Sequence, residues 1–535
     1  MKQYCIKTQT IFLFIILQIF SICNSVPLST SSRWIVDQCT GKRVKLACAN
    51  WVSHLEPMIA EGLEKKPLKY IASQIAANGF NCVRFTWPTF MFTRLDYKSL
   101  TVNQSLDKYN LTTAKSGIAK NNPQILNMKI IDVHKAVVNE LGKNNLMVVL
   151  DNHVSEPKWC CKSDDGNGFF GDPSFDPKEW LKGLKEVARK YKDNSAVVGM
   201  SLRNELRGKR QNVTEWYKYM QQGAKTIHKQ NPDLLVIISG LYWDSTLEFL
   251  KQKPLKLNFN NKTVYEAHRY SFGIPGQLDW VTQTNQACAD LNRAARENYL
   301  FLTKGNNPFP LFFSEFGADQ SGQNEAGNRF ISCMLAMLAE NDLDWALWTF
   351  QGSYMFREGS IDLDEAYGVM DHNWDGPRNP MFLKRLPFAE QLNQDTKSSS
   401  DQKTHYKILY PLTGQCVRSK AGKVILDTCK KATRWDQYGE AIKVAGSSRC
   451  LVAAGDRAAA GVSDDCSSEW KFVSNSGLHL AVLNGQGGYL CLEKNGSDNT
   501  LVTKKCLCVG DDLVDFPTCA DNPQVQWFKF VPTNV

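Results

Sequence analysis

Eight short apolar segments alternate with amphipathic helical patterns between residues 44 and 350. One helical stripe of apolar residues begins at Pro67 and ends at Gly79, and the apolar segment 80–85 follows it. Proline suits the first turn of a helix, and glycine suits the position just past its last turn. The same unit recurs along the chain, and the expected strands are 44–51, 80–85, 146–150, 198–202, 234–239, 263–270, 310–317 and 345–350.

This alternation predicts an α/β fold in which helices cover a parallel sheet. Eight units over about 350 residues predict a closed (β/α)8 TIM barrel. The competing fold is an open, doubly wound sheet, but no Gly-rich phosphate loop follows the first strand. We therefore place a (β/α)8 barrel at residues 33–393.

Two glutamates stand where apolar strands end. Glu205 comes directly after Arg203 and Asn204 at the end of the fourth strand, and Glu315 precedes a glycine at the end of the seventh. A buried apolar strand cannot solvate a carboxylate, so each glutamate should lie at the mouth of its strand. In a (β/α)8 barrel the strand mouths form the active site, and the two side chains are therefore expected to act on one substrate.

The composition changes near residue 393. Residues 394–403 contain no apolar side chain, and we place a linker at 394–404. Beyond it, at 405–533, helical stripes give way to three repeats that each hold two cysteines and a later tryptophan. These are Cys416, Cys429 and Trp435; Cys450, Cys466 and Trp470; Cys491, Cys506 and Trp527. The repeats predict a small all-β domain with one disulfide and one buried tryptophan per unit, plus an extra pair, Cys508 and Cys519.

The first 25 residues have the pattern of a secretory signal peptide. Lys2 and Lys7 precede an apolar run at 11–22, and small residues follow it. The run is about a dozen residues long, which is short for a membrane span. We expect cleavage near residue 25 and a secreted, extracellular protein with no membrane attachment, located in the cell wall or apoplast if the source is a plant. An uncleaved anchor is the alternative.

Cysteine usage agrees with secretion. Fifteen of the 17 cysteines lie beyond the signal segment, and an odd number predicts at least one unpaired thiol. Cys39 and Cys48 flank a turn, which suits a local disulfide, and Cys160 with Cys161 could anchor the loop after the third strand. Five Asn-x-Ser/Thr sequons predict a glycoprotein, at Asn103, Asn110, Asn212, Asn261 and Asn495.

Charge and metal-ligand patterns narrow the function classes. The formal net charge of +9 is dispersed, and no basic stripe alternates with aromatic residues, so no nucleic-acid partner is expected. Asp362, Asp364 and Glu365 lack the loop pattern of a Ca²⁺ site and are expected to form a solvated face. No His/Cys spacing indicates another metal, and we expect neither a metal nor a cofactor.

The polar residues at the strand ends together resemble glycoside hydrolase family 5, the cellulase and mannanase family, over about residues 34–392. The residues that carry the resemblance are Arg84, His153, Asn204, Glu205, His268, Tyr270, Glu315 and Trp348. The first strand departs from the family, because Ala49-Asn50-Trp51 replaces the usual Gly-x-Asn. The region 405–533 resembles a ricin B-type lectin β-trefoil, but none of its repeats keeps an intact Gln-x-Trp. Sugar binding and a purely structural role are both open for it.

The resemblance implies hydrolysis with retention of configuration, in which Glu205 is the acid/base and Glu315 the nucleophile. The other residues would bind the substrate or support this pair. Asn204 would hold the sugar 2-hydroxyl, Arg84 and Tyr270 would keep Glu315 ionised, His153 and His268 would fix the sugar and the acid/base side, and Trp348 would face the sugar ring. Four further tryptophans follow strand ends and could form sugar subsites or pack inward, namely Trp87, Trp159, Trp243 and Trp374.

We therefore predict a secreted, monomeric retaining β-glycosidase that acts on a β-linked polysaccharide of the β-1,4-glucan or mannan type. One alternative is a transglycosylase on the same substrates, in which a sugar replaces water. Another is a non-catalytic carbohydrate-binding or defence protein. The polar linker further predicts that the barrel folds without the C-terminal domain.

Overall fold

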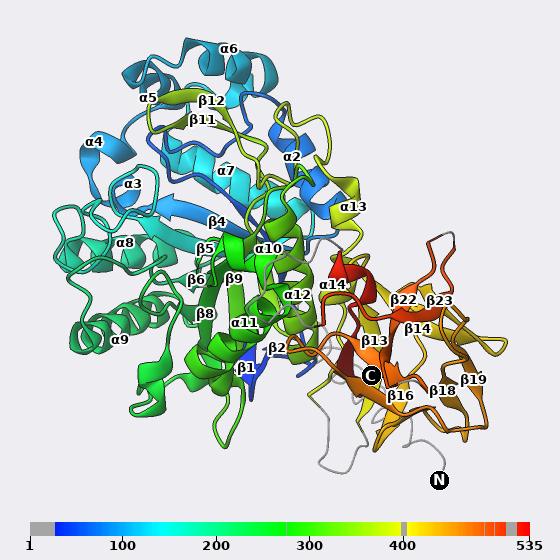
Figure 1. The fold of residues 1–535 in the computed structure, drawn as a ribbon. Helices are drawn as coiled ribbons and strands as arrows, with labels where there is room; N and C mark the ends of the chain where they lie inside the picture. The colour runs from blue at the N-terminus through cyan, green and yellow to red at the C-terminus, as the bar shows by residue number, and fades with distance from the viewer. Residues whose placement is uncertain (1–26, 274, 397–403, 486, 497, 510–521) are drawn as a thin grey trace, which may run out of the picture.

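The computed structural model describes residues 27–396, 404–509 and 522–535, apart from positions 274, 486 and 497. The expected signal peptide at 1–25 and most of the expected linker at 394–404 lie outside these ranges. A closed barrel of eight parallel strands is surrounded by helices, and an all-β region lies beside it (Figure 1). The predicted (β/α)8 TIM barrel is thereby confirmed. Within the described ranges, no helix combines the length and apolarity that crossing a membrane requires.

The barrel strands pair in chain order, and the last closes on the first. They are β3 (Ala47–Trp51), β4 (Cys82–Pro88), β5 (Met147–Val154), β6 (Val197–Ser201), β7 (Leu235–Ile238), β8 (Thr263–Tyr270), β9 (Leu311–Gly317) and β10 (Asp344–Leu347). The outer helices are α2 (Leu68–Ala77), α7 (Ile130–Lys143), α8 (Pro177–Lys190), α9 (Val213–Gln230), α11 (Thr284–Asn298) and α12 (Glu325–Asn341).

The outer helices form for local reasons and also hold the strand ends in place. Helix α8 begins at Pro177 after an Asp176 cap, and its apolar stripe includes the fully buried Trp180. The indole of Trp180 donates a hydrogen bond of 2.9 Å to the carbonyl of Leu202, just past β6. This bond fixes the chain immediately before Asn204 and Glu205.

The expectation of a helix between every pair of strands is wrong after β7. Two short 3₁₀ turns, η2 (Glu248–Lys251) and η3 (Asn260–Lys262), replace an α-helix there. Pro254 lacks a backbone N–H and stops helical hydrogen bonding soon after η2. Buried leucines at 250, 255 and 257 still cover the strands, so the segment buries its apolar side chains without regular structure.

A hairpin covers the N-terminal end of the barrel. The hairpin consists of strands β1 (Leu28–Ser31) and β2 (Trp34–Asp37). Its residues Leu28 and Ile35 lie in one apolar cluster with residues of the barrel strands, such as Val149. The hairpin begins before residue 33, where the barrel domain was expected to start.

The expected Cys39–Cys48 disulfide is wrong. Cys48 lies in β3 directly opposite Cys82 in β4, and these two residues form the disulfide. The strand register therefore decides the pairing, which the turn between Cys39 and Cys48 could not indicate. Cys39 is disulfide-bonded too. The unpaired cysteine that the odd count predicts is not among the described residues, because each cysteine there is in a disulfide.

Long connections build up the C-terminal face of the barrel. After β4 come the helices α3 (Thr89–Thr93), α4 (Leu95–Lys98), α5 (Val102–Lys108) and α6 (Thr112–Asn121). After β10 comes a hairpin of β11 (Ser353–Arg357) and β12 (Ser360–Asp364). Tyr109 and Phe356 join these two connections through a ring contact of 5.6 Å. Shorter helices are α10 (Gln277–Thr282), α13 (Pro380–Leu383) and α14 (Pro387–Glu390).

The C-terminal region is all-β. Its strands are β13 (His405–Tyr410), β14 (Gln415–Lys420), β15 (Lys423–Asp427), β16 (Trp435–Tyr438), β17 (Ala441–Val444), β18 (Cys450–Val452), β19 (Gly461–Ser463), β20 (Trp470–Phe472), β21 (Leu480–Leu483), β22 (Tyr489–Lys494), β23 (Leu501–Lys505) and β24 (Lys529–Thr533). Each repeat holds the predicted disulfide, Cys416–Cys429, Cys450–Cys466 and Cys491–Cys506, and the three late tryptophans are buried. The proposed partner of Cys508, Cys519, lies outside the described residues.

The C-terminal region packs directly on the barrel through α12 (Figure 1). Trp527 and Leu478 belong to the same apolar cluster as the barrel core. The buried Arg385 donates to the carbonyl of Pro411 at 3.1 Å and to the hydroxyl of Ser332 at 2.7 Å. Because this interface is apolar and hydrogen-bonded, it weighs against the prediction that the barrel folds without the C-terminal region.

We predict that the interface, and not the linker, keeps the two parts together. A chain cleaved at an engineered protease site within 397–403 should elute from gel filtration as one species. A chain that ends at residue 393 should unfold about 5–10 °C lower, because it exposes several buried apolar side chains. If the cleaved parts separate on gel filtration, or if the shortened chain keeps the wild-type midpoint of thermal unfolding, the barrel folds independently of the C-terminal region.

Candidate active site

The predicted site residues converge at the C-terminal end of the barrel. Most lie in the barrel strands, while Asn204 and Glu205 follow the end of β6 by three and four residues and Trp348 directly follows β10. A cavity of 840 Å³ opens there. Seven of the eight predicted residues line it, and the eighth, Arg84, lies buried beneath: His153, Asn204, Glu205, His268, Tyr270, Glu315 and Trp348.

Glu205 and Glu315 approach each other closely. One carboxylate oxygen of each, together with a ring nitrogen of His268, lies in a group whose members are all within 4.8 Å of one another. Glu205 has a φ of 44°, in the left-handed region that side-chain-bearing residues rarely adopt. Such backbone strain persists where surrounding contacts hold it, and the hydrogen bond from the Glu205 N–H to Asp244 is one of these contacts.

Glu315 accepts two strong hydrogen bonds. Arg84 donates from Nη1 to Oε1 at 2.7 Å, and the hydroxyl of Tyr270 donates to Oε2 at 2.8 Å. The pKa of Glu315 lies above its ordinary value, because burial outweighs the opposing effect of the neighbouring His268 and Arg84. Hydrogen bonds of this kind favour the ionised carboxylate, which is the form that a nucleophile needs.

Glu205 has a different environment. Burial raises the pKa of Glu205 to about 7, against the opposing charges of Arg207 and Arg84. Its Oε1 lies 2.9 Å from Nδ1 of His268, and the other nitrogen of that ring lies 2.9 Å from the hydroxyl of Ser314. Glu205 can therefore hold a proton near neutral pH, whereas the bonds from Arg84 and Tyr270 favour the ionised form of Glu315, and such a difference separates an acid from a nucleophile.

Arg84 connects the pair to a wider network of carboxylates. Its guanidinium lies 3.0 Å from Asp151 and 3.6 Å from Glu266, in addition to its bond with Glu315. It also donates to the side-chain oxygens of Asn50, at 3.0 Å, and Asn204, at 2.9 Å. Asn50 thus supports Arg84 from below, although the first strand departs from the family pattern.

His153, Asn204 and Trp348 form the wall on one side. His153 donates from Nδ1 to Asp151 at 2.7 Å, and its Nε2 lies 3.3 Å from the amide nitrogen of Asn204. Burial holds the pKa of His153 well below its usual range, so the ring is neutral and Nε2 accepts. The ring is stacked on Trp348 at 5.6 Å and on His54 at 4.0 Å.

The four further tryptophans separate into two groups. Trp159 and Trp243 line the cavity, whereas Trp87 and Trp374 are fully buried in the barrel core. Only the first two can contact a sugar. Glu365 also lines the cavity and is buried, with hydrogen bonds from the Tyr354 hydroxyl and the Tyr367 amide, so the solvated face expected for it is wrong.

Several residues of the site were missed at the level of sequence. They are His54, Asp151, Arg207, Asp244 and Glu266. Glu266 could have been found, because the two-residue period of a strand puts it on the same face as His268 and Tyr270. Asp244 lies in a loop, where its Oδ2 accepts the backbone N–H of Glu205 at 3.1 Å, and no local pattern signals that contact.

Two groups of side chains have the spacing of metal ligands. One is Glu205, His268 and Glu315, and the other is His153, Cys160 and Cys161. The two cysteines are bonded to each other and carry no thiolate, so the second group does not suit a metal. The first group consists of the two carboxylates of the candidate active site and the histidine that lies beside them.

A (β/α)8 barrel with two close, differently tuned carboxyl groups at its mouth is the arrangement of a glycoside hydrolase. The model of the family "Cellulase (glycosyl hydrolase family 5)" matches residues 52–353. A "Glycosyl hydrolase 5 family protein" of Chamaecyparis obtusa is 43% identical over 533 residues, which are 96% of this chain and 94% of that protein. The chain belongs to glycosyl hydrolase family 5.

More distant relatives share the barrel. An endoglucanase of Paenibacillus polymyxa is 21% identical over 391 residues, covering 70% of this chain and 90% of that protein. The solved catalytic domain of the major endoglucanase from Xanthomonas campestris pv. campestris superposes with a TM-score of 0.55 at 19% identity, over 68% of this chain and 99% of that one. At 19% identity, this structural similarity shows that the two chains share the same fold.

We predict that Tyr270→Phe shifts the acidic limb of the pH profile. Loss of its hydrogen bond raises the pKa of Glu315, so activity that needs the ionised carboxylate is lost at a higher pH as the pH falls. The alkaline limb, set by Glu205 with its pKa of about 7, should stay in place. At the optimum, kcat/KM on an aryl β-cellobioside should fall roughly 10- to 100-fold.

Tyr299→Phe is the matched control. Tyr299 is also buried, and its hydroxyl has no hydrogen-bond partner among the residues described. Its substitution should leave both limbs unchanged. An unshifted acidic limb in Tyr270→Phe, or an equal shift in the control, would contradict the support of Glu315 by Tyr270.

Proposed function

We propose that this protein is a retaining β-glycosidase that hydrolyses β-1,4-linked glucan chains. The observation that carries the proposal is the approach of Glu205 and Glu315 within 4.8 Å. Retaining enzymes hold their carboxyl groups only about 5–5.5 Å apart, whereas inverting enzymes leave room for a water between them. The endoglucanases among the relatives support glucan over mannan as the substrate.

In the proposed mechanism, Glu315 attacks the anomeric carbon while Glu205 protonates the leaving oxygen. A covalent glycosyl-enzyme results, and Glu205, now deprotonated, activates the water that releases the sugar. Arg84 and Tyr270 hold Glu315 ionised through the hydrogen bonds described above. His268 orients Glu205.

The remaining residues position the sugar. The amide of Asn204 faces the cleft and is suited to the sugar 2-hydroxyl, a contact that strengthens in the oxocarbenium-like transition state. Trp348 presents a ring to the cleft and suits the apolar face of a sugar, with His153 stacked on it. Trp159 and Trp243 suit neighbouring sugar units.

Two further parts of the proposal concern location and domain type. We propose that the protein acts outside the cell, because six disulfides join described residues and such bonds persist in oxidising compartments. We also propose that the C-terminal all-β region is a β-trefoil of the ricin B type. Its three repeats, each with a disulfide and a buried tryptophan, support this assignment.

Azide distinguishes the two glutamates. On an activated aryl cellobioside, Glu205→Ala still forms the glycosyl-enzyme, and azide should intercept it to give the β-azide with retained configuration. Glu315→Ala vacates the nucleophile's position, so azide should attack directly and give the inverted α-azide. Without azide, Glu315→Ala should lose roughly 10³-fold or more in kcat, as other enzymes do when they lose a nucleophile.

Glu186→Ala is a suitable control, because Glu186 lies on the outer helix α8 and pairs with Arg189. It should keep wild-type turnover and give no azide product. The same azide product from both active-site variants would refute the two roles. Wild-type release of sugars from mannan but not from β-1,4-glucan would correct the substrate and leave the mechanism standing.

A further inference from the structure

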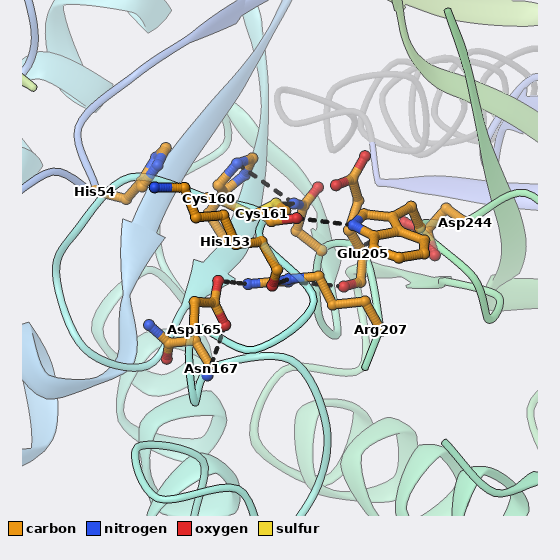
Figure 2. Close-up of a disulfide and its surroundings, with 12 residues drawn as sticks. His54, His153, Cys160, Cys161, Asp165, Asn167, Glu205, Arg207 and Asp244 are labelled. Carbon is orange, nitrogen blue, oxygen red and sulfur yellow. Dashed lines mark hydrogen bonds and ion pairs between the residues drawn. A yellow bond between two sulfur atoms is a disulfide. The ribbon is translucent and has the colours of Figure 1, made fainter. Parts of the chain in front are cut away.

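The bonded pair Cys160–Cys161 lies in the wall of the active-site cleft. Both residues line the 840 Å³ cavity, next to His153 and on the side toward Glu205 (Figure 2). Cys160 is buried, and Cys161 is partly exposed to the cleft. Nothing in the proposed mechanism uses this disulfide.

The pair contributes little to stability through the unfolded chain. A disulfide restricts the unfolded chain more strongly when more residues separate its cysteines. The other disulfides between described residues close separations of 13 to 45 residues, whereas Cys160 and Cys161 are adjacent. Its role must therefore come from what the two sulfurs and their backbone contact in the folded protein.

The sulfurs contact the amide of Asn204. Its nitrogen lies 3.6 Å from each Sγ, while its oxygen accepts a hydrogen bond of 2.9 Å from Arg84. Sulfur is a weak acceptor, and the other contact of this nitrogen, to Nε2 of His153, is long at 3.3 Å, so the N–H groups of Asn204 are only weakly bound at the cleft. A sugar hydroxyl can therefore take these donors at little cost in lost protein hydrogen bonds.

The backbone of Cys161 and of the next residue, Lys162, contacts the opposite part of the site. The carbonyl of Cys161 accepts a hydrogen bond of 2.9 Å from the indole of Trp243, and the carbonyl of Lys162 accepts one of 3.0 Å from Arg207. Arg207 in turn donates to the carbonyl of Glu205 at 2.8 Å and pairs with Asp165 (Figure 2). One short segment thus reaches the sugar-binding amide, the cleft tryptophan and the acid/base.

We propose that the Cys160–Cys161 disulfide is a positioning element of the active site, which orients the Asn204 amide toward the substrate and fixes Trp243 across the cleft. This inference rests on the proposed glucan hydrolysis. Without the bond, the two side chains at these positions would adopt their rotamers independently of each other. The disulfide fixes both sulfurs against Asn204, and a misplacement of about 1 Å in an active site can cost about 100-fold in rate.

The test is the double variant Cys160→Ser/Cys161→Ser, which leaves no lone thiol to mispair. Its kcat/KM on cello-oligosaccharides should fall at least about 10-fold. Its thermal midpoint should stay within about 2 °C of wild type, because the lost loop constraint is small. Cys450→Ser/Cys466→Ser, which removes a disulfide of the C-terminal region, is the control and should keep wild-type kcat/KM.

A double-mutant cycle separates positioning from a merely structural role. If the disulfide acts through Asn204, its removal in an Asn204→Ala background should cost much less in kcat/KM than its removal from wild type. An unchanged kcat/KM in the double variant, or an equal loss in both backgrounds, would overturn the inference while the wild type still hydrolyses glucan. A wild type inactive on every β-1,4-glucan would instead overturn the proposed function, and this inference with it.

Discussion

A single buried guanidinium organises the active site. Arg84 is fully enclosed, and an uncompensated charge in such a place would cost several kcal/mol, so carboxylates must surround it. They come from three different strands, as Asp151 in β5, Glu266 in β8 and Glu315 in β9. The guanidinium that supports Glu315 in the proposed mechanism therefore also balances carboxylates from two other barrel strands.

Burial and the neighbouring carboxylates Asp151 and Glu266 also raise the pKa of Glu205. The carboxyl groups around Arg84 outnumber it, and they cannot all be ionised in a buried space. Burial and the neighbouring Glu266 and Glu205 hold the pKa of Asp244 well above its usual range, and Glu205 is raised to about 7. Arg84 donates directly to Glu315 but not to Glu205, and this difference in contacts supports the different protonation states that the proposed mechanism assigns to the two glutamates.

Much of this arrangement could be predicted from the sequence, because strand ends are local features. The period of the helices and the glycines after them located the barrel strands, and each predicted site residue proved to be at the mouth of its strand or, like Arg84, beneath it. The Cys–Cys–Trp repeats likewise predicted the C-terminal disulfides, because short separations in small repeats leave few partners.

What could not be predicted depends on contacts between distant segments. The pairing of Cys48 with Cys82 follows from strand register, and the packing of Trp527 on the barrel follows from the docking of two regions. Asp244 reaches Glu205 from a loop after β7, where even the expected helix is missing. Neither periodicity nor spacing along the chain carries such information.

The most direct test of the central assignment is to trap the glycosyl-enzyme. A 2-deoxy-2-fluoro cellobioside with a good leaving group slows both steps and should accumulate the covalent intermediate. Tryptic digestion should then show one added glycosyl mass on the peptide Gly305–Arg329, and fragmentation should place it on Glu315 and not on Glu325. Label on the peptide Asn204–Arg207, which contains Glu205, or turnover with no covalent species, would contradict the assignment of Glu315 as the nucleophile.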